Sequence, residues 1–205
     1  MDIVKVAKGR AYVTPVAEDQ NSYFNHHGLF LASSQEVIYA TVVLMGAALP
    51  KQHELDLVPG DTVMYQRPLL SKGMYDAVDK DGNVFTLVHQ DDLLAKLGPS
   101  KSKAASDLLP LGNWVICEVL HEDHYAGPVL VLAGRTKYVI RGRGKNVVPE
   151  LGVGDEVCVK QNVATRLVTG AGDDFNREFV FLRDSNVLAI FDKKGDTVVG
   201  APSQE

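Results

Sequence analysis

The chain has 205 residues, of which 45% are hydrophobic and 23% are charged, values that are ordinary for a globular protein. Its net charge is −5, and neither half is basic: residues 1–97 hold 8 Lys and Arg against 12 Asp and Glu, and the remainder holds 13 against 14. This balance argues against a nucleic-acid partner. No apolar run is long enough to span a bilayer and no signal-peptide pattern opens the sequence, so we expect a cytoplasmic protein without a membrane partner.

The first predicted strand covers residues 10–17. Its proline lacks a backbone N–H, so we expect the strand to lie at a sheet edge or to carry a bulge. The polar, aperiodic stretch of residues 18–27 predicts a loop, and three bulky apolar residues follow it at 29–31. Residues 37–45 are rich in β-branched and aromatic side chains, a composition that predicts a strand.

Further strands are predicted in the rest of the first half. The next one starts after Gly60-Asp61. An Asp-Gly pair within residues 79–83 is typical of a tight turn, so the strands on either side are expected to form a hairpin. Residues 83–97 contain two short apolar runs separated by a polar kink, and residues 98–106 have the small, polar composition of a linker.

The second half follows the same plan. Residues 109–119 predict a strand, and the polar residues 121–126 predict a loop that again leads into apolar residues. The basic sequence at residues 141–145 lacks the order of a phosphate-binding loop and is interpreted as a solvated or subunit-contact turn. Residues 177–191 contain two apolar runs joined by a tight Asp-Ser-Asn turn, and the polar tail from residue 195 is expected to fray.

The two halves repeat each other at a constant offset of 94 residues. Residues 83–97 match residues 177–191, and Gly60-Asp61 matches Gly154-Asp155, without a gap. A chain with two equivalent halves is two copies of one unit. Since no stretch shows a helical period over three turns, the sequence predicts an all-β protein in which each copy is a small β-barrel.

These blocks resemble the C-terminal half of a subunit of the GroES (chaperonin-10) co-chaperonin family. Residues 153–157 and 181–190 carry the resemblance in the second copy, and residues 58–63 and 91–95 carry it in the first. The resemblance implies two tandem GroES-like small β-barrels. The expected parts are copy 1 at 1–97, a linker at 98–107, copy 2 at 108–194 and a flexible tail at 195–205.

The resemblance also implies a function. In this family a mobile loop ends in an apolar segment that orders on contact and inserts into a groove of a GroEL-type chaperonin. The corresponding chaperonin-binding residues would be Gly28, Leu29, Phe30 and Leu31 in the first copy and Gly127, Val129, Leu130 and Val131 in the second. Each contact of a disordered loop is weak, and a homo-oligomeric ring that presents many loops recovers affinity through effective concentration. A capping protein of this kind needs no active site and no cofactor, because its partner binds the ATP.

Three departures from the family qualify this expectation. Pro128 stands where the family usually has Gly, which affects the flexibility of the second loop. Residues 46–60 and 144–154 are shorter than the hairpin that roofs the family's dome, as in the roofless co-chaperonins of some bacteriophages. Tandem copies resemble the double-domain chaperonin-10 of chloroplasts, yet no transit peptide is recognisable, so a phage or bacterial origin is favoured.

The same residues are compatible with other interpretations. Each apolar triplet is also compatible with an ordinary buried strand, and the whole chain with a structural oligomer, such as a virion or assembly protein built on the same barrels. An enzyme is not expected: medium-chain alcohol dehydrogenases contain a GroES-like domain, but this chain leaves no residues for their nucleotide-binding domain.

The two polar loops contain possible metal ligands. These are His121, Asp123 and His124 in one loop and Asp19, His26 and His27 in the other. Neither set has the closed four-ligand spacing of a structural zinc site, so solvated histidines and no metal are expected. Cys117 and Cys158 lie in strand-like runs and are predicted to be small buried thiols in a reduced cytosol.

Overall fold

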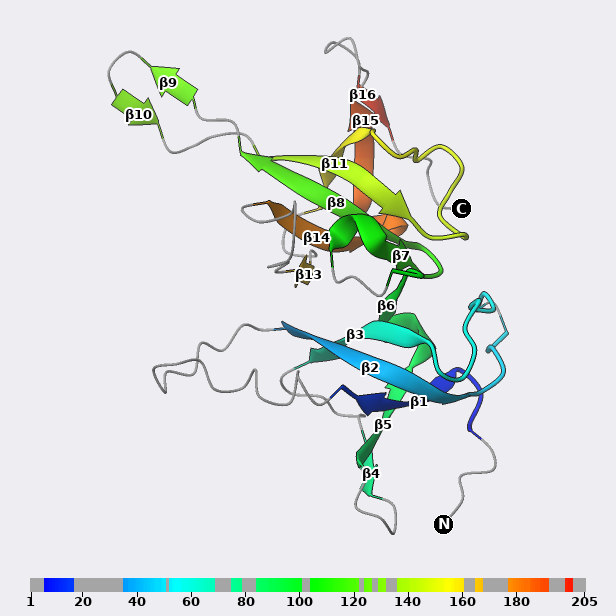
Figure 1. Cartoon of the computed structure of the whole chain (residues 1–205). Helices are drawn as coiled ribbons and strands as arrows, with labels where there is room; N and C mark the ends of the chain where they lie inside the picture. Colours follow the sequence, from blue (N-terminus) through cyan, green and yellow to red (C-terminus); the bar gives the residue numbers. More distant parts are fainter. Residues whose placement is uncertain are drawn as a thin grey trace, which may run out of the picture. The chain divides into compact units, whose positions relative to one another are not determined.

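The computed structural model divides the chain into two compact units, residues 1–100 and residues 101–205 (Figure 1). It describes residues 6–16, 35–50, 52–68, 75–78, 84–100, 104–121, 124–126, 129–131, 136–160, 165–167, 177–191 and 198–200. Over these ranges the regular elements are β-strands and single-turn 3₁₀ helices, so the fold is all-β. No helix in this part of the chain has the length and apolar character needed to cross a membrane.

Antiparallel strands build the first unit. They are β1 (Arg10–Pro15), β2 (Gln35–Met45), β3 (Thr62–Pro68), β4 (Tyr75–Val78), β5 (Val84–His89) and β6 (Leu93–Leu97), with the 3₁₀ helix η2 (Gln90–Asp92) between the last two. These strands are neighbours in one sheet, in the order β4-β5-β1-β2-β3-β6. The β4–β5 pair confirms the hairpin expected around the Asp-Gly turn, whose own residues lie outside the described ranges.

Strand β1 does not match the prediction that it lies at a sheet edge or carries a bulge. It lies between β5 and β2, so it is an interior strand and not an edge strand. Its register with β2 shifts between Tyr12 and Val13, but the extra residue of this bulge is Val43 on β2. The Val16 N–H donates to the Tyr39 carbonyl of β2, so the nitrogen of Pro15 faces the opposite side of the strand. The described ladder with β5 ends at Val13, and an interior strand therefore tolerates the proline beyond that point.

The second unit contains a larger set of described strands. They are β7 (Leu108–Pro110), β8 (Trp114–His121), β9 (His124–Ala126), β10 (Val129–Val131), β11 (Thr136–Arg143), β12 (Glu156–Val159), β13 (Thr165–Leu167), β14 (Glu178–Arg183), β15 (Val187–Phe191) and β16 (Val198–Gly200), with the 3₁₀ helices η3 (Ala105–Asp107) and η5 (Asp184–Asn186). Seven strands form one sheet in the order β13-β14-β8-β11-β12-β15-β16, and β9 and β10 form a separate two-stranded sheet.

Two local predictions for this half are wrong, those for the basic turn and for the polar loop. Residues 141–143 of the expected basic turn are the last residues of β11. The expected polar loop at residues 121–126 contains the end of β8 and the whole of β9. The boundary between the two units, after Ser100, lies within the expected linker at 98–107, whose last residues form η3, where Ala105 is buried. In the tail, residues 198–200 form β16 and pair with β15.

The two units have the same topology. β5, η2 and β6 correspond to β14, η5 and β15, and all of their boundaries are shifted by 94 residues. Strands β4, β1, β2 and β3 correspond to β13, β8, β11 and β12, and both sheets follow the same order. The repeat found in the sequence is therefore also a repeat of strand order.

The predicted closed barrels are not seen in the described residues. Neither strand order closes on itself there, and the strands form open antiparallel sheets.

The Gly-Asp pair before β3 and β12 closes the same turn in both units. Gly60 and Gly154 adopt φ angles of +96° and +93°, in the left-handed region that side-chain-bearing residues disfavour. The aspartate that follows accepts a hydrogen bond from the backbone N–H three residues earlier, at 2.9 Å in the first unit and 2.7 Å in the second. A short motif thus fixes where each strand starts.

A second glycine marks the point where two backbone segments cross. The N–H of Gly46 donates to the carbonyl of Arg10, and the N–H of Gly144 donates to the carbonyl of Trp114, both at 2.8 Å. A Cβ atom on Gly144 would overlap the carbonyl oxygen of Gly112, and the first unit has the same close approach. The 3₁₀ corner is tied to this crossing, because the buried Gln90 side chain donates to the Gly46 carbonyl at 2.7 Å.

We expect Gly144→Ala to destabilise the second unit by about 1–3 kcal/mol, the usual cost of overpacking, because the added methyl meets backbone that cannot move aside. Chemical denaturation followed by tryptophan fluorescence measures this, since Trp114 lies at the crossing. Gly142→Ala is the matched control: its Cβ would lie 3.4 Å from the Pro110 side chain, an ordinary contact. Equal stability of the two variants would contradict the crossing as a constraint.

Candidate functional site

The second apolar segment is a strand of a small hairpin. Val129, Leu130 and Val131 form β10 and pair with Ala126, Tyr125 and His124 of β9. In Figure 1 this green hairpin extends beyond the ends of β8 and β11, separate from the main sheet of its unit. Of the other predicted binding residues, Gly127 and the first-copy residues Gly28, Leu29, Phe30 and Leu31 lie outside the described residues.

The hairpin is carried by a stem formed from β8 and β11. Their pairing runs from Val115–Arg143 at one end to His121–Thr136 at the other. On the β8 side of the stem, β14 pairs with β8 as far as Val119. On the β11 side, the described ladder of β12 reaches Tyr138, which lies opposite Val119. Beyond the row of Val119 and Tyr138, the described stem continues as the two strands β8 and β11, and the β9–β10 hairpin follows.

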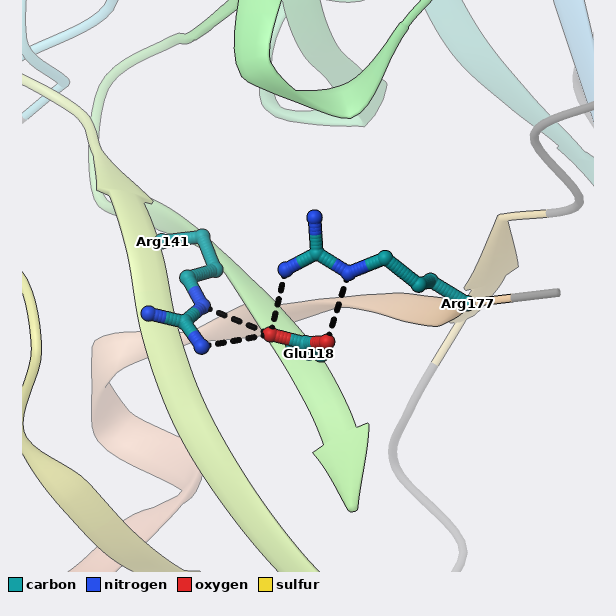
Figure 2. A network of polar contacts seen from close by, with 3 residues as sticks. All are labelled: Glu118, Arg141 and Arg177. Atoms are coloured by element: carbon teal, nitrogen blue, oxygen red, sulfur yellow. Dashed lines mark hydrogen bonds and ion pairs between the residues drawn. The ribbon is translucent and has the colours of Figure 1, made fainter. Parts of the chain in front are cut away.

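A buried carboxylate lies one residue inside that last supported row. The Glu118 side chain on β8 is only 8% exposed and contacts two arginines, Arg141 on β11 and Arg177 just before β14. Arg177 donates from Nε to Oε1 and from Nη2 to Oε2, both at 2.7 Å. Arg141 donates from Nε to Oε2 at 2.7 Å and lies 2.6 Å from it through Nη2. Figure 2 shows the carboxylate between the two guanidinium groups.

These contacts keep the carboxylate charged. The Arg177 hydrogen bonds lower the pKa of Glu118 below its ordinary value, and Arg141 adds to the effect through its hydrogen bond and its charge. Burial acts in the opposite direction, and the balance leaves the pKa lowered. Two arginines and one glutamate give this cluster, the Glu118 clamp, a net charge of +1. The clamp joins three neighbouring strands at the base of the hairpin.

A β-bulge places Arg141 in the clamp. The register shifts between Ile140 and Gly142, so Arg141 is the extra residue of the bulge. Bulges redirect a side chain in this way. The clamp was not predictable from the sequence, because a single Glu in an apolar strand and an Arg in a basic run give no indication that they meet until the register of the sheet is known.

The first unit has the same bulge without the charges. Its register shift leaves Val43 as the extra residue, at the position that corresponds to Arg141. By the same strand correspondence Thr14 matches Glu118, and by the 94-residue offset Asn83 matches Arg177. The backbone device is therefore common to both units, whereas the clamp belongs to the second unit.

Other candidate residues have structural roles. Arg143 donates to the carbonyl oxygens of Leu151 at 2.6 Å and Val147 at 3.1 Å, so it holds a connecting segment and is not a solvated turn residue. Burial raises the pKa of the Cys117 thiol to about 12, as expected for an inert core cysteine. Cys158 is only partly buried, contrary to the prediction for it.

The described residues contain no group of three or more His, Cys, Asp and Glu side chains that could hold a metal ion. Comparison with protein-family models and with curated proteins finds no match to the chain.

The clamp predicts a specific response to acid. A carboxylate whose pKa is lowered by folding stabilises the protein above its unfolded pKa, near 4.5, and this contribution is lost as the pH falls through the folded pKa. The free energy of unfolding should therefore fall more steeply below about pH 4.5 in the wild type than in Glu118→Gln. Denaturant titrations of both proteins between neutral pH and pH 3 measure the difference. Parallel pH profiles would show that Glu118 is not held in this way.

Proposed function

We propose that the chain is a co-chaperonin that caps a GroEL-type chaperonin ring and assists ATP-dependent protein folding. The observation that carries this proposal is the placement of the apolar residues Val129–Val131 in a two-stranded hairpin outside the main sheet of their unit. An isolated two-stranded hairpin is marginally stable in water, so such a segment gains by docking on a partner. An apolar groove of the chaperonin would provide the docking surface.

The repeated topology supports two binding segments per chain. The hairpin lies in the connection between β8 and β11, and the corresponding connection in the first unit, between β1 and β2, contains the apolar residues 29–31. Weak contacts at many loops add up through effective concentration and still allow release when the partner changes state.

On this proposal each sheet belongs to a GroES-like barrel, and the short connections at residues 46–60 and 144–154 leave the cap without a roof, as in bacteriophage co-chaperonins. The chain would work in the cytoplasm, that of the host cell if it is phage-encoded. It would bind no cofactor and catalyse no reaction itself, because the chaperonin binds and hydrolyses the ATP.

A homo-oligomer, in the form of a ring, is part of the proposal. Leu188 on β15 is 50% exposed, whereas its counterpart Leu94 on β6 is fully buried. A second copy of the chain would cover this exposed leucine. The same observation favours the alternative function, a structural oligomer built on these units without capping activity. Complementation of a co-chaperonin-deficient cell separates the two, since only the capping protein restores growth.

Leu130→Asp tests the second binding segment. The change should abolish nucleotide-dependent binding to the chaperonin, because burying a Leu side chain contributes roughly 1.5–3 kcal/mol and a charge in an apolar groove adds a desolvation cost. The melting temperature should stay unchanged, because the hairpin lies outside the main sheet of its unit. Phe30→Asp is the corresponding change in the first segment. Val153→Asp alters an equally apolar side chain that is 60% exposed in the turn before β12, and it should bind normally.

Two results would count against the segments as contacts. Retained binding by the Leu130 or Phe30 variant removes that segment from the interface. A lowered melting temperature assigns the residue to the core of its unit.

Leu188→Asp tests the oligomer. It should shift the sedimentation profile toward smaller species without lowering the melting temperature, because burial of half a Leu side chain contributes about 1 kcal/mol at every interface of a ring. Leu94→Asp is the comparison, since a charge at that fully buried position should unfold the first unit. An unchanged sedimentation profile of the Leu188 variant would exclude this surface from the interface.

A further inference from the structure

The central strand pair that leads to each apolar segment is the stem of its unit, β1 and β2 in the first unit and β8 and β11 in the second. The two stems differ in how far a neighbouring strand pairs with them. In the first unit, β3 pairs with β2 at every residue from Thr41 back to Gln35, the first residue of β2. In the second unit, the described pairing of β12 with β11 covers Tyr138 and Val139. The second stem therefore has fewer described backbone pairs with its neighbouring strand than the first, at the end that leads to its hairpin.

The Glu118 clamp lies where this support decreases. Glu118 is opposite Val139 on one side and opposite Phe179 on the other, next to the last row in which β14, β8, β11 and β12 all pair. Its carboxylate fastens β8 to β11 through Arg141 and to the start of β14 through Arg177. Charge-assisted and bidentate contacts of this kind are stronger and more directional than neutral hydrogen bonds.

The pairing of Arg177 is reinforced by a neighbour. Its guanidinium carbon lies 5.1 Å from the centre of the Phe179 ring, close enough for a cation–π contact. Phe179 is itself buried in the core at 2% exposure, so one arginine of the clamp rests on a fixed part of the second unit. Arg141 extends the attachment to the strand that leaves the hairpin.

We propose that Glu118, held by Arg141 and Arg177, is a positioning residue that fixes the root of the β9–β10 hairpin beyond the row at which the described ladder of β12 with β11 stops. The unit whose described ladder stops at Tyr138 has the clamp. The unit whose described ladder continues to the first residue of β2 carries Thr14, Val43 and Asn83 at the three positions. Burial of an ion pair contributes little net stability compared with neutral residues of similar size, whereas it restricts geometry. The consequence for chaperonin affinity rests on the proposed function, but the positioning itself does not.

The first unit supplies the test variant. Glu118→Thr, Arg141→Val and Arg177→Asn made together replace the clamp with the first unit's residues and leave no unpaired charge behind. Hydrogen exchange of the free protein is then measured at the far end of the stem, at residues 120–121 and 136–137, and in the sheet core at Ile116 and Val180. We expect exchange to be about tenfold faster at the stem end, the effect of losing a charge-assisted hydrogen bond, and unchanged in the core.

Two controls accompany this measurement. Glu156→Gln removes the ion pair of Glu156 with Lys137, which also joins β11 to a neighbouring strand at 3.3 Å, and it should leave stem-end exchange within about twofold of the wild type because the pair is partly exposed. Arg141→Lys with Arg177→Lys keeps both charges but not the forked donors, so it should reproduce most of the acceleration.

The outcomes are distinguishable. Selective acceleration at the stem end supports positioning by the clamp. Equal acceleration throughout the second unit shows a general stabilising role and overturns the proposal, as does unchanged exchange at the stem end. Chaperonin binding is measured separately: if the wild type fails to bind, the proposed function fails, and the exchange result still decides whether Glu118 positions the hairpin.

Discussion

Both units depend on the close crossing of two backbone segments at a glycine. At Gly46 and Gly144 the chain passes so near another strand's start that no side chain fits, and the glycine N–H bonds to that strand's first carbonyl. The 3₁₀ corner attaches at the same place, since the N–H of Gln90 donates to the carbonyl of Gly9 and the N–H of Asp184 to that of Asn113. In the second unit, β8 and β11 are fixed at this end, and the β9–β10 hairpin follows their opposite end. The position of the hairpin therefore follows from a constraint far from it in the fold.

Local sequence patterns were sufficient for the features that depend on local chemistry. The Gly-Asp turns, the two apolar runs on either side of each 3₁₀ corner, and the 94-residue repeat were all predictable, because each one reflects a fixed backbone conformation or a period within a few residues. The repeat also predicted that the two halves share one strand order. The expected all-β fold is confirmed, because the described elements are strands and single-turn 3₁₀ helices.

Features that depend on register could not be predicted. The proline of β1 suggested an edge strand or a bulge in that strand, yet β1 is interior and the bulge lies on β2. The proline is tolerated because the ladder with β5 stops two residues before Pro15. Glu118 meets Arg141 only through a bulge and meets Arg177 across another strand, 59 residues away in sequence. The apolar residues 129–131 were expected after a loop, and their pairing with β9 depends on three residues that composition classed as polar loop. In each case the partner lies on another strand, and a linear pattern does not say which.

The repeat also shows that the two connections that contain the apolar segments differ in length. Corresponding residues are 104 apart at β1 and β8, 99 apart at Gly28 and Gly127, and 98 apart at β2 and β11. Five additional residues therefore precede the first segment and one follows it. Five residues of fully extended chain span at most about 17 Å, which sets the largest difference in reach that these extra residues could provide. A longer tether searches a larger volume at a lower local concentration. On the proposed function, the two segments of one chain would therefore not be equivalent contacts, because the connections that carry them differ in length.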